Sequence, residues 1–245
     1  MIRHTGCSVV ELRRYTLHPG ARETLIDLFD RELVEPQEAV GAHVLGQFRD
    51  IDDPDAFVWL RGFRDMEARR RALSAFYGGP VWARHRDAAN ATMIDSDDVR
   101  LLRPVHDREG LVAGGDRPAP GAGAAGRRLL VVVVLPLRPQ AARGFPSFFE
   151  RSVAPDLRTA GATLAATLRT EHAPNDYPAL PVRKGEELFV WLSTFDDMAA
   201  HARHQAALER SAAWRQSVSP ALAQRLDGPP ETFRLAPTAR SLLPR

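Results

Sequence analysis

An internal repeat constrains the fold of this chain more than any other feature of its sequence. Residues 57–90 align without a gap with residues 189–222, and about a third of the paired positions are identical. Both segments begin with Phe-Val-Trp-Leu, and Trp82 later in the first coincides with Trp214 in the second. The 245 residues are therefore expected to form two units of similar topology, each long enough to bury its own core.

The two copies are separated by a segment of unusual composition. Residues 105–126 are dominated by Gly, Ala and Pro, which bury little apolar surface, so we expect a flexible linker there. The chain then divides into a first repeat at 1–104, the linker at 105–126, and a second repeat at 127–245. The second copy carries about a dozen extra residues within 170–186, where Pro and charged residues predict a long loop between strands.

The first copy predicts the order β-α-β-β-α-β. Strands are expected where residues alternate or are rich in β-branched and aromatic types, at 9–17, 42–49, 56–63 and 99–103. One helix is expected over 21–34. A second begins after Asp65, a favourable N-cap, breaks at Gly78-Gly79, restarts at Pro80 and runs to about Met93. This order is the split βαβ arrangement of an α+β fold.

The second copy contains an unbroken run of four valines at 131–134. A strand of this kind is usually buried on both faces. The run therefore predicts a sheet covered by helices on one face and by a second sheet on the other.

Composition argues against several classes of protein. The formal net charge is only +2, so no strong field favours nucleic acid or an anionic membrane. Cys7 is the only cysteine, which excludes an intrachain disulfide and a cysteine metal cage. The longest apolar run, 129–135, is too short to span a bilayer, and the N-terminal residues lack the apolar core of a signal peptide. We therefore expect a cytoplasmic protein.

The repeat also provides an internal control for locating a site. Positions kept in both copies are expected to serve the fold, whereas polar positions that become apolar or small in the second copy are candidates for ligand binding. These positions are Arg13, Tyr15, His43, Gln47, Arg61, His85, Arg86 and Asn90. Trp82 is added because it lies on the same helical stripe as the last three, and Tyr77, which becomes Glu209, because it lies at the helix break.

Strand geometry gathers several of these positions. Residues two apart in a strand share a face, so Arg13 and Tyr15 are expected to point the same way. For the same reason, His43 is expected on the face that carries Leu45 and Gln47. If these faces converge with the stripe on the broken helix, they enclose one cleft.

The chemistry of these side chains suggests their roles. His43, His85 and Tyr77 are the candidate catalytic residues, because imidazole is a general base near neutral pH and a phenol exchanges protons. The expected substrate-binding residues are Arg13, Tyr15, Gln47, Arg61, Trp82, Arg86 and Asn90. Arginine would hold a carboxylate or stabilise an enolate-like anion, and the aromatic rings would form walls.

Structural roles remain open for the same residues. Arg13 can simply pair with Glu11, and the recurring Trp82 can be a core residue. Its counterpart Trp214 is likewise expected to be buried. His43 is more often a satisfied strand residue than a base.

A metal site is not expected. His201 and His204 are three residues apart on a predicted helix, but no third ligand has suitable spacing. Haem ligation by His85 or His204 has no supporting motif and stays open. No other cofactor is predicted.

The first copy resembles the NIPSNAP family. Its segments Glu-Leu-Arg at 11–13, Tyr-Thr-Leu at 15–17 and Pro-Gly at 19–20 are similar to the opening E-L-R-x-Y-x-L-x-P-G pattern, and the match continues through Pro104. The second copy resembles the family more weakly. The resemblance implies two ferredoxin-like βαββαβ repeats, which would form a dimeric α+β barrel within one chain. Further association into a homodimer is left open.

The resemblance narrows the function only to a class of small-molecule proteins, because the wider superfamily contains cofactor-free monooxygenases, polyketide cyclases, isomerases, haem-binding enzymes and binding proteins. We expect a small-molecule site in the first copy of a bacterial chain. It would serve a cofactor-independent acid–base enzyme of secondary or aromatic metabolism, acting as a cyclase, isomerase, lyase or monooxygenase. The alternative is a non-catalytic ligand-binding or protein-interaction module. The sequence does not decide whether the chain is an enzyme.

Overall fold

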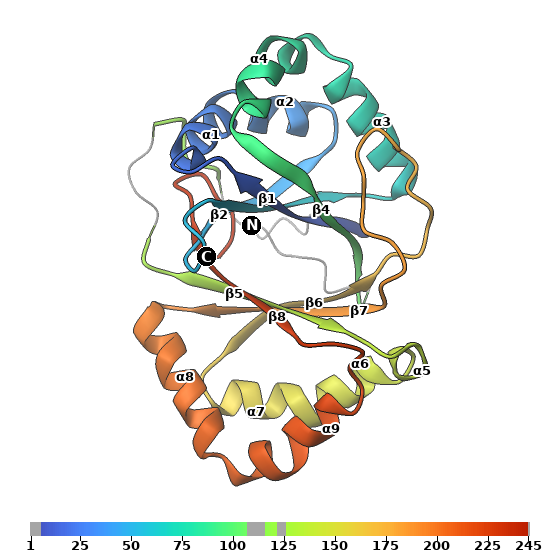
Figure 1. The fold of residues 1–245 in the computed structure, drawn as a ribbon, viewed down its shortest axis with the longest axis vertical. Coiled ribbons are helices and arrows are strands. Elements are labelled where there is room, and N and C mark those ends of the chain that lie inside the picture. The colour runs from blue at the N-terminus through green and yellow to red at the C-terminus, as the bar shows by residue number, and fades with distance from the viewer. Residues whose placement is uncertain (1–5, 107–115, 122–125, 245) are drawn as a thin grey trace.

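The computed structural model describes residues 6–106, 116–121 and 126–244 (Figure 1). The strands are β1 (Val9–Leu17), β2 (His43–Asp50), β3 (Ala56–Phe63), β4 (Met93–Pro104), β5 (Leu129–Pro136), β6 (Thr163–Thr170), β7 (Leu188–Phe195) and β8 (Glu231–Pro237). The α-helices are α1 (Arg22–Leu28), α2 (Val34–Ala39), α3 (Met66–Tyr77), α4 (Pro80–Asn90), α5 (Pro139–Ala142), α6 (Phe145–Phe148), α7 (Ala154–Thr159), α8 (Met198–Arg210) and α9 (Ser219–Ala223). Short π-helical turns link some of them, at η1 (Phe29–Leu33), η2 (Phe149–Val153) and η3 (Trp214–Val218).

The described strands form a closed antiparallel barrel in the order β1-β3-β2-β8-β5-β7-β6-β4. We call residues 6–106 the first half and residues 126–244 the second half. Each half contributes four adjacent strands, and the two sets join through the pairs β2–β8 and β4–β6. The helices of each half lie on the outer side of its own strands, so the molecule has helices at both ends and strands between them (Figure 1). The chain therefore has a mixed α/β fold.

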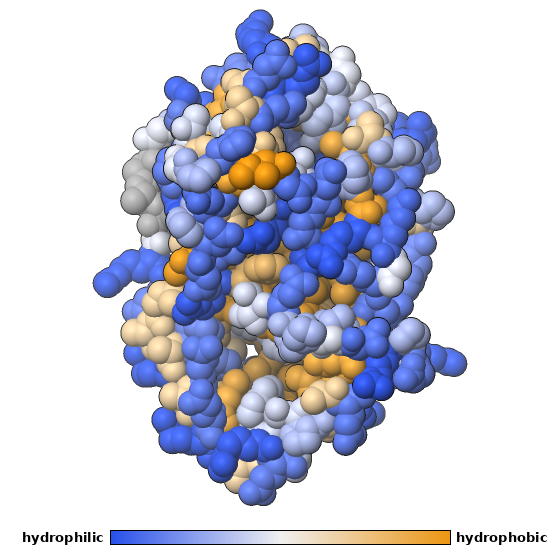
Figure 2. Space-filling view, viewed as in Figure 1, coloured by the Kyte–Doolittle hydropathy of each residue, from blue (hydrophilic) through white to orange (hydrophobic). Residues whose placement is uncertain are grey.

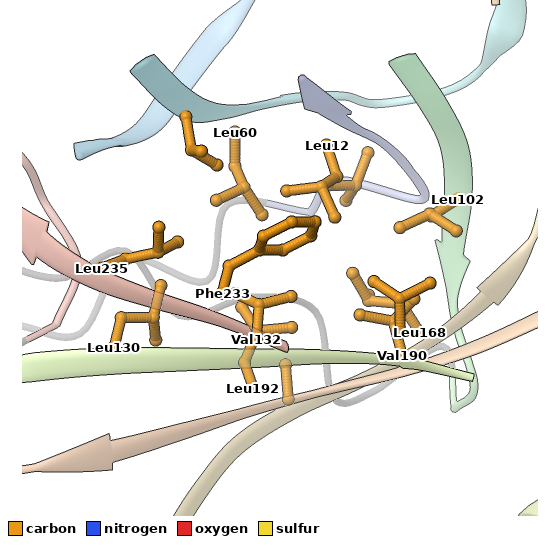
Figure 3. Close-up of a cluster of buried hydrophobic side chains, with 14 of the residues drawn as sticks. Leu12, Leu60, Leu102, Leu130, Val132, Leu168, Val190, Leu192, Phe233 and Leu235 are labelled. Atoms are coloured by element: carbon orange, nitrogen blue, oxygen red, sulfur yellow. The ribbon is translucent and has the colours of Figure 1, made fainter. Parts of the chain in front are cut away.

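The barrel interior holds an apolar core built from both halves. Leu12 and Leu60 of the first half meet Val132 and Leu192 of the second half (Figure 3). Along β5, Val132 and Val134 face this interior, whereas Val131 and Leu135 lie under the helices of the second half. The prediction that the valine run is buried on both faces is confirmed for Val131, Val132 and Val134, while Val133 is half-buried.

The caps of the longest helices follow the sequence. Asp65 accepts a hydrogen bond from the Ala68 backbone N–H at 2.7 Å, and Asp197 caps α8 in the same way. The predicted break separates α3 from α4. Glycine is needed at position 79, because a Cβ there would lie 2.7 Å from the Ala75 carbonyl oxygen. Beyond the break, α4 packs against α3 and η1.

Other element boundaries differ from prediction. The first helical segment continues through η1 to the end of α2, well beyond the predicted end at residue 34. β4 begins at Met93 rather than at residue 99, because its polar first residues still pair with β1 through an irregular register. Trp82 and Trp214 are both half-buried rather than core residues, because each borders a groove at the surface.

A β-bulge in β2 changes one predicted face. Val44 pairs with Arg61 and Gly46 pairs with Leu60, so Leu45 is an extra residue in the ladder. Leu45 consequently points into the barrel. The prediction that His43, Leu45 and Gln47 share one face is wrong for Gln47, since the extra residue reverses the alternation between His43 and Gln47.

The predicted linker is partly anchored. Arg117 donates hydrogen bonds to Glu38, to the Val44 carbonyl at 2.5 Å and to the Arg240 carbonyl at 2.6 Å. Through these bonds, residues 116–121 of the predicted linker are tied to β2 and α2. Its remaining stretches, 107–115 and 122–125, lie outside the described residues.

Candidate functional site

A cleft of about 310 Å³ lies in the first half, between β1, the corner of α3 and α4, and the loop 171–187 that precedes β7. Its lining residues are Arg13, Tyr15, Tyr77, Trp82, Arg86, Asn90, Met93, Ser96, Tyr177, Ala179 and Leu180. Six of the ten residues predicted from the sequence are among them, namely Arg13, Tyr15, Tyr77, Trp82, Arg86 and Asn90. The volume is at the lower end for ligand sites and suits a molecule of two or three fused rings.

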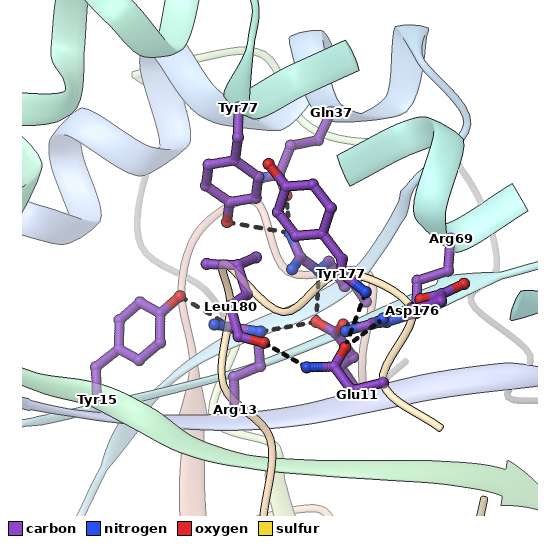
Figure 4. Close-up of polar contacts among 11 residues, drawn as sticks. Glu11, Arg13, Tyr15, Gln37, Arg69, Tyr77, Asp176, Tyr177 and Leu180 are labelled. Atoms are coloured by element: carbon purple, nitrogen blue, oxygen red, sulfur yellow. Dashed lines mark hydrogen bonds and ion pairs between the residues drawn. The ribbon is translucent and has the colours of Figure 1, made fainter. Parts of the chain in front are cut away.

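The floor of the cleft rests on a buried charge cluster around Glu11 (Figure 4). The alternation of β1 places Glu11, Arg13 and Tyr15 on the face below the helices. The Glu11 carboxylate accepts hydrogen bonds from Arg13 Nη1 at 2.8 Å, from Arg61 Nε at 2.7 Å and from Arg69 Nε at 2.7 Å. One carboxylate therefore organises three guanidinium groups drawn from β1, β3 and α3.

The electrostatics of this cluster are dominated by arginine. Burial raises the pKa of Glu11, but attraction to Arg61, Arg13 and Arg69 outweighs it and holds that pKa far below its usual range. Arg69 also pairs with Asp176, 2.5 Å away. Three positive charges thus face two negative ones, and the cluster keeps one net positive charge beneath the cleft.

Two tyrosine hydroxyls face the cleft with their oxygens already occupied. Tyr15 Oη accepts from Arg13 Nε at 3.1 Å, and Tyr77 Oη accepts from Arg61 Nη1 at 3.4 Å. Burial raises the pKa of Tyr15 despite the nearby Arg13, so its phenol keeps its proton at neutral pH. Each hydroxyl can then donate its hydrogen to a ligand.

Aromatic rings form the walls above these hydroxyls. The Tyr77 and Trp82 rings meet edge to face, with centroids 5.0 Å apart. Tyr177 lies nearly parallel to Tyr77 at 6.1 Å. The arrangement suits a flat aromatic body, with its polar group turned toward Arg13 and Tyr15.

Four predicted residues do not line the cleft. Arg61 is fully buried beneath it, and Gln47 donates to Asp30 of η1 at 3.1 Å. His43 is exposed at the start of β2, and the bulge turns it away from Gln47. His85 lies 3.6 Å from Glu32 of η1 and is absent from the cleft lining.

The sequence indicated some of the remaining site residues only weakly. Glu11 was considered as a partner of Arg13 but not as the centre of a cluster. The loop 171–187 showed only as an insertion, and nothing in its sequence indicates that Tyr177 and Leu180 reach the other half. Arg69 gave no usable signal, because its counterpart His201 is also polar.

The paired histidines of the second half form part of its core. His201 and His204 pack against the Phe195 ring, with centroids 5.0 and 5.1 Å away. Within the described ranges, no three His, Cys, Asp or Glu side chains are grouped to hold a metal ion. Within the same ranges, no helix has the length and apolar character needed to cross a membrane.

Comparison with known proteins gives a family and a fold. Residues 10–107 match the NIPSNAP family, while no curated protein matches the chain. An anthrone oxidase-like protein is similar in structure at 16% identity, covering 94% of this chain and 91% of its own, with a TM-score of 0.60. A candidate monooxygenase from Fusobacterium nucleatum is similar at 10% identity, with 94% and 92% covered and a TM-score of 0.59. Another, from Lactobacillus acidophilus, has 10% identity, 94% and 93% coverage and a TM-score of 0.56. At these identities the likeness shows a shared fold.

Proposed function

Residues 10–107 belong to the NIPSNAP family, and on this premise we propose that the chain is a small-molecule protein whose site is the first-half cleft. We further propose that each half is one ferredoxin-like βαββαβ repeat, with boundaries at 1–104 and 127–245. A single chain would then form the barrel that two subunits form in dimeric relatives. The order of elements in the two halves and the two strand junctions support this proposal.

The observation that carries the functional proposal is the set of donors at the floor of the cleft. Arg13 is buried and charged, and the Tyr15 and Tyr77 oxygens are engaged by arginines. The hydroxyl hydrogens of the two tyrosines, together with the net positive charge below them, would stabilise one oxyanion on a bound ligand. An enolate or phenolate on an aromatic body fits both the donors and the walls.

These donors support cofactor-independent acid–base chemistry of the cyclase, isomerase, lyase or monooxygenase type. Arg13 and Tyr15 would stabilise the oxyanion as a carbonyl compound enolises, and Tyr77 would return a proton to it. The described lining contains no histidine or carboxylate, so the substrate must be acidic enough to lose its proton to water. Enolisable polycyclic ketones meet that requirement. His43 and His85 have no part in this scheme.

A ligand-binding protein without catalysis is the second candidate, and the lack of a base among the described lining residues favours it. A protein-interaction role has less support. The face in Figure 2 is mostly hydrophilic, with hydrophobic residues in recessed patches. The large hydrophobic side chains exposed in the described ranges are scattered along the chain, at Val40, Ile51, Ile94 and Met198.

Binding of 2-naphthoate and of its neutral counterpart 2-naphthamide tests the oxyanion site. Wild-type protein should bind the carboxylate at least about tenfold more tightly in titration calorimetry, because charged hydrogen bonds contribute about 1.5–3 kcal/mol. Tyr15→Phe, which removes only the hydroxyl, should lose most of that preference. Equal binding of the two compounds by wild-type protein would contradict the proposal.

Turnover separates the enzyme from the binding protein. Anthrone in air is oxidised to anthraquinone when one O₂ is consumed and one water is formed, and absorbance follows the change. Faster conversion with wild-type protein than with Tyr15→Phe would support an enzyme. Binding of 2-naphthoate without acceleration of this or related ketones would favour the non-catalytic candidate.

A further inference from the structure

The loop 171–187 distinguishes the two halves. In the first half, the corresponding connection between β2 and β3 is the short turn 51–55. In the second half, the loop leaves the strands of its own half and runs along α3 of the first half (Figure 1). It therefore adds residues to the site of the half to which it does not belong.

The loop supplies one wall of the cleft. Tyr177, Ala179 and Leu180 line it directly. Tyr177 and Leu180 also pack against the first-half cluster that contains Phe63 and Leu73. These contacts half-bury Tyr177 and Leu180 on the first half, so the wall is part of the fold.

A buried arginine anchors this wall. Arg69 Nη1 donates to Asn175 Oδ1 at 3.0 Å and to Asp176 Oδ1 at 2.5 Å, while its Nε holds Glu11 (Figure 4). Asn175 in turn donates to the Leu180 carbonyl at 2.9 Å. The position of the wall is thereby tied to the same charge cluster that supports Arg13.

We infer that loop 171–187 is the specificity element of the first-half cleft, with Tyr177 and Leu180 limiting the ring system that enters and Asp176 positioning them through Arg69. This inference rests on the proposed function. The ligand class it implies is a flat, singly charged anion whose rings contact Tyr177 and Tyr77. Loss of the Tyr177 ring should weaken binding of two-ring ligands and admit larger ones.

Three aromatic carboxylates of increasing size test the inference: benzoate, 2-naphthoate and 2-anthracenecarboxylate. For Tyr177→Ala, calorimetry should show about tenfold weaker binding of 2-naphthoate, the loss expected for one aromatic contact. The ratio of three-ring to two-ring affinity should rise at the same time. Tyr177→Phe should restore the wild-type ranking. Lys184→Gln, an exposed position on the same loop that is absent from the cleft lining, is the matched control and should also keep it.

The anchor is tested without any ligand. Asp176→Asn should speed amide hydrogen exchange across 174–181, whereas Lys184→Gln should leave it unchanged. Unchanged exchange in Asp176→Asn would overturn the anchoring role.

The outcomes separate this inference from the proposed function. If wild-type protein binds none of the three carboxylates, both fail. If wild-type protein binds 2-naphthoate and Tyr15→Phe does not, but Tyr177→Ala keeps the full ranking, the specificity role of the loop is wrong and the proposed function stands.

Discussion

The two halves use the same strand for opposite purposes. Beneath its helices, β1 presents Glu11, Arg13 and Tyr15, whereas the corresponding positions of β5 lie within the apolar segment 131–135. The second half covers that segment with side chains such as Phe149 and Trp191. The helix-covered face can therefore be filled without a cluster of charged side chains, which shows that the fold does not require the charges of the first half.

Buried charges of this kind are costly to desolvate, and apolar residues of similar volume often replace them at no loss of stability. Their presence in only one half is best explained by a ligand that needs them. Groups with strongly shifted pKa values also gather at functional sites, and Glu11 is such a group.

The largest expected effect follows from removing the central carboxylate. Glu11→Gln would leave three buried guanidinium groups with Asp176 as their one remaining counter-charge among the residues of this cluster. We expect a loss of about 3–5 kcal/mol in the free energy of unfolding, measured by urea denaturation.

Glu67→Gln is the matched control, because Glu67 forms an exposed pair with Arg71 on α3. Its cost should stay within about 0.5 kcal/mol. If the two variants lose similar amounts, the first-half cluster does not depend on its carboxylate.

As the pH falls, the two halves should begin to lose stability at different pH values. Burial lowers the pKa of His201 and His204, so their protonation favours the unfolded chain as the pH falls below their ordinary value of 6.5. The Glu11 pKa is also lowered, but its stabilising contribution persists until the pH falls below the ordinary glutamate value of 4.5. The second half should therefore respond to acid first.

Unfolding free energies measured from about pH 7 to pH 5.5 test this order. The decline in wild-type protein should shrink in the double variant His201→Leu, His204→Leu. Glu11→Gln should keep it. A decline of the same size in the double variant would assign it to other groups.

Substitution of the paired tryptophans should have the smallest effect on stability. It should also distinguish a residue that contacts the ligand from one that serves only the fold. Both are half-buried, so Trp82→Ala and Trp214→Ala should each cost about 1–2 kcal/mol, less than the 3–5 kcal/mol of a fully buried ring. Only Trp82→Ala should weaken 2-naphthoate binding, by about tenfold. Equal weakening by Trp214→Ala would place a ligand contact in the second half as well.

Local features of the fold could be predicted because local residues determine them. The strands at 9–17 and 56–63 were predicted to the residue, and the Asp65 cap and the Gly78-Gly79 break carry their own signals. The bulge at Leu45 could not be predicted, since it depends on which β3 residues pair with β2. For this reason His43 was wrongly placed on the same face as Gln47.

The site was predicted in part, through the contrast between the two copies. That contrast selected Arg13 and Tyr15 because their counterparts, Val133 and Leu135, have no polar group. Tyr77, whose counterpart is Glu209, was selected for its place at the helix break. It could not select Tyr177, since an insertion has no counterpart to compare and its path across the molecule is a tertiary property.

One measurement tests the central claim that the first-half charges serve a ligand rather than the fold. The triple variant Glu11→Leu, Arg13→Met, Arg61→Met replaces most of the cluster with apolar residues of similar volume. We expect a free energy of unfolding equal to or above that of wild-type protein, together with loss of 2-naphthoate binding. A variant that fails to fold, or that folds and still binds 2-naphthoate with wild-type affinity, would contradict the account.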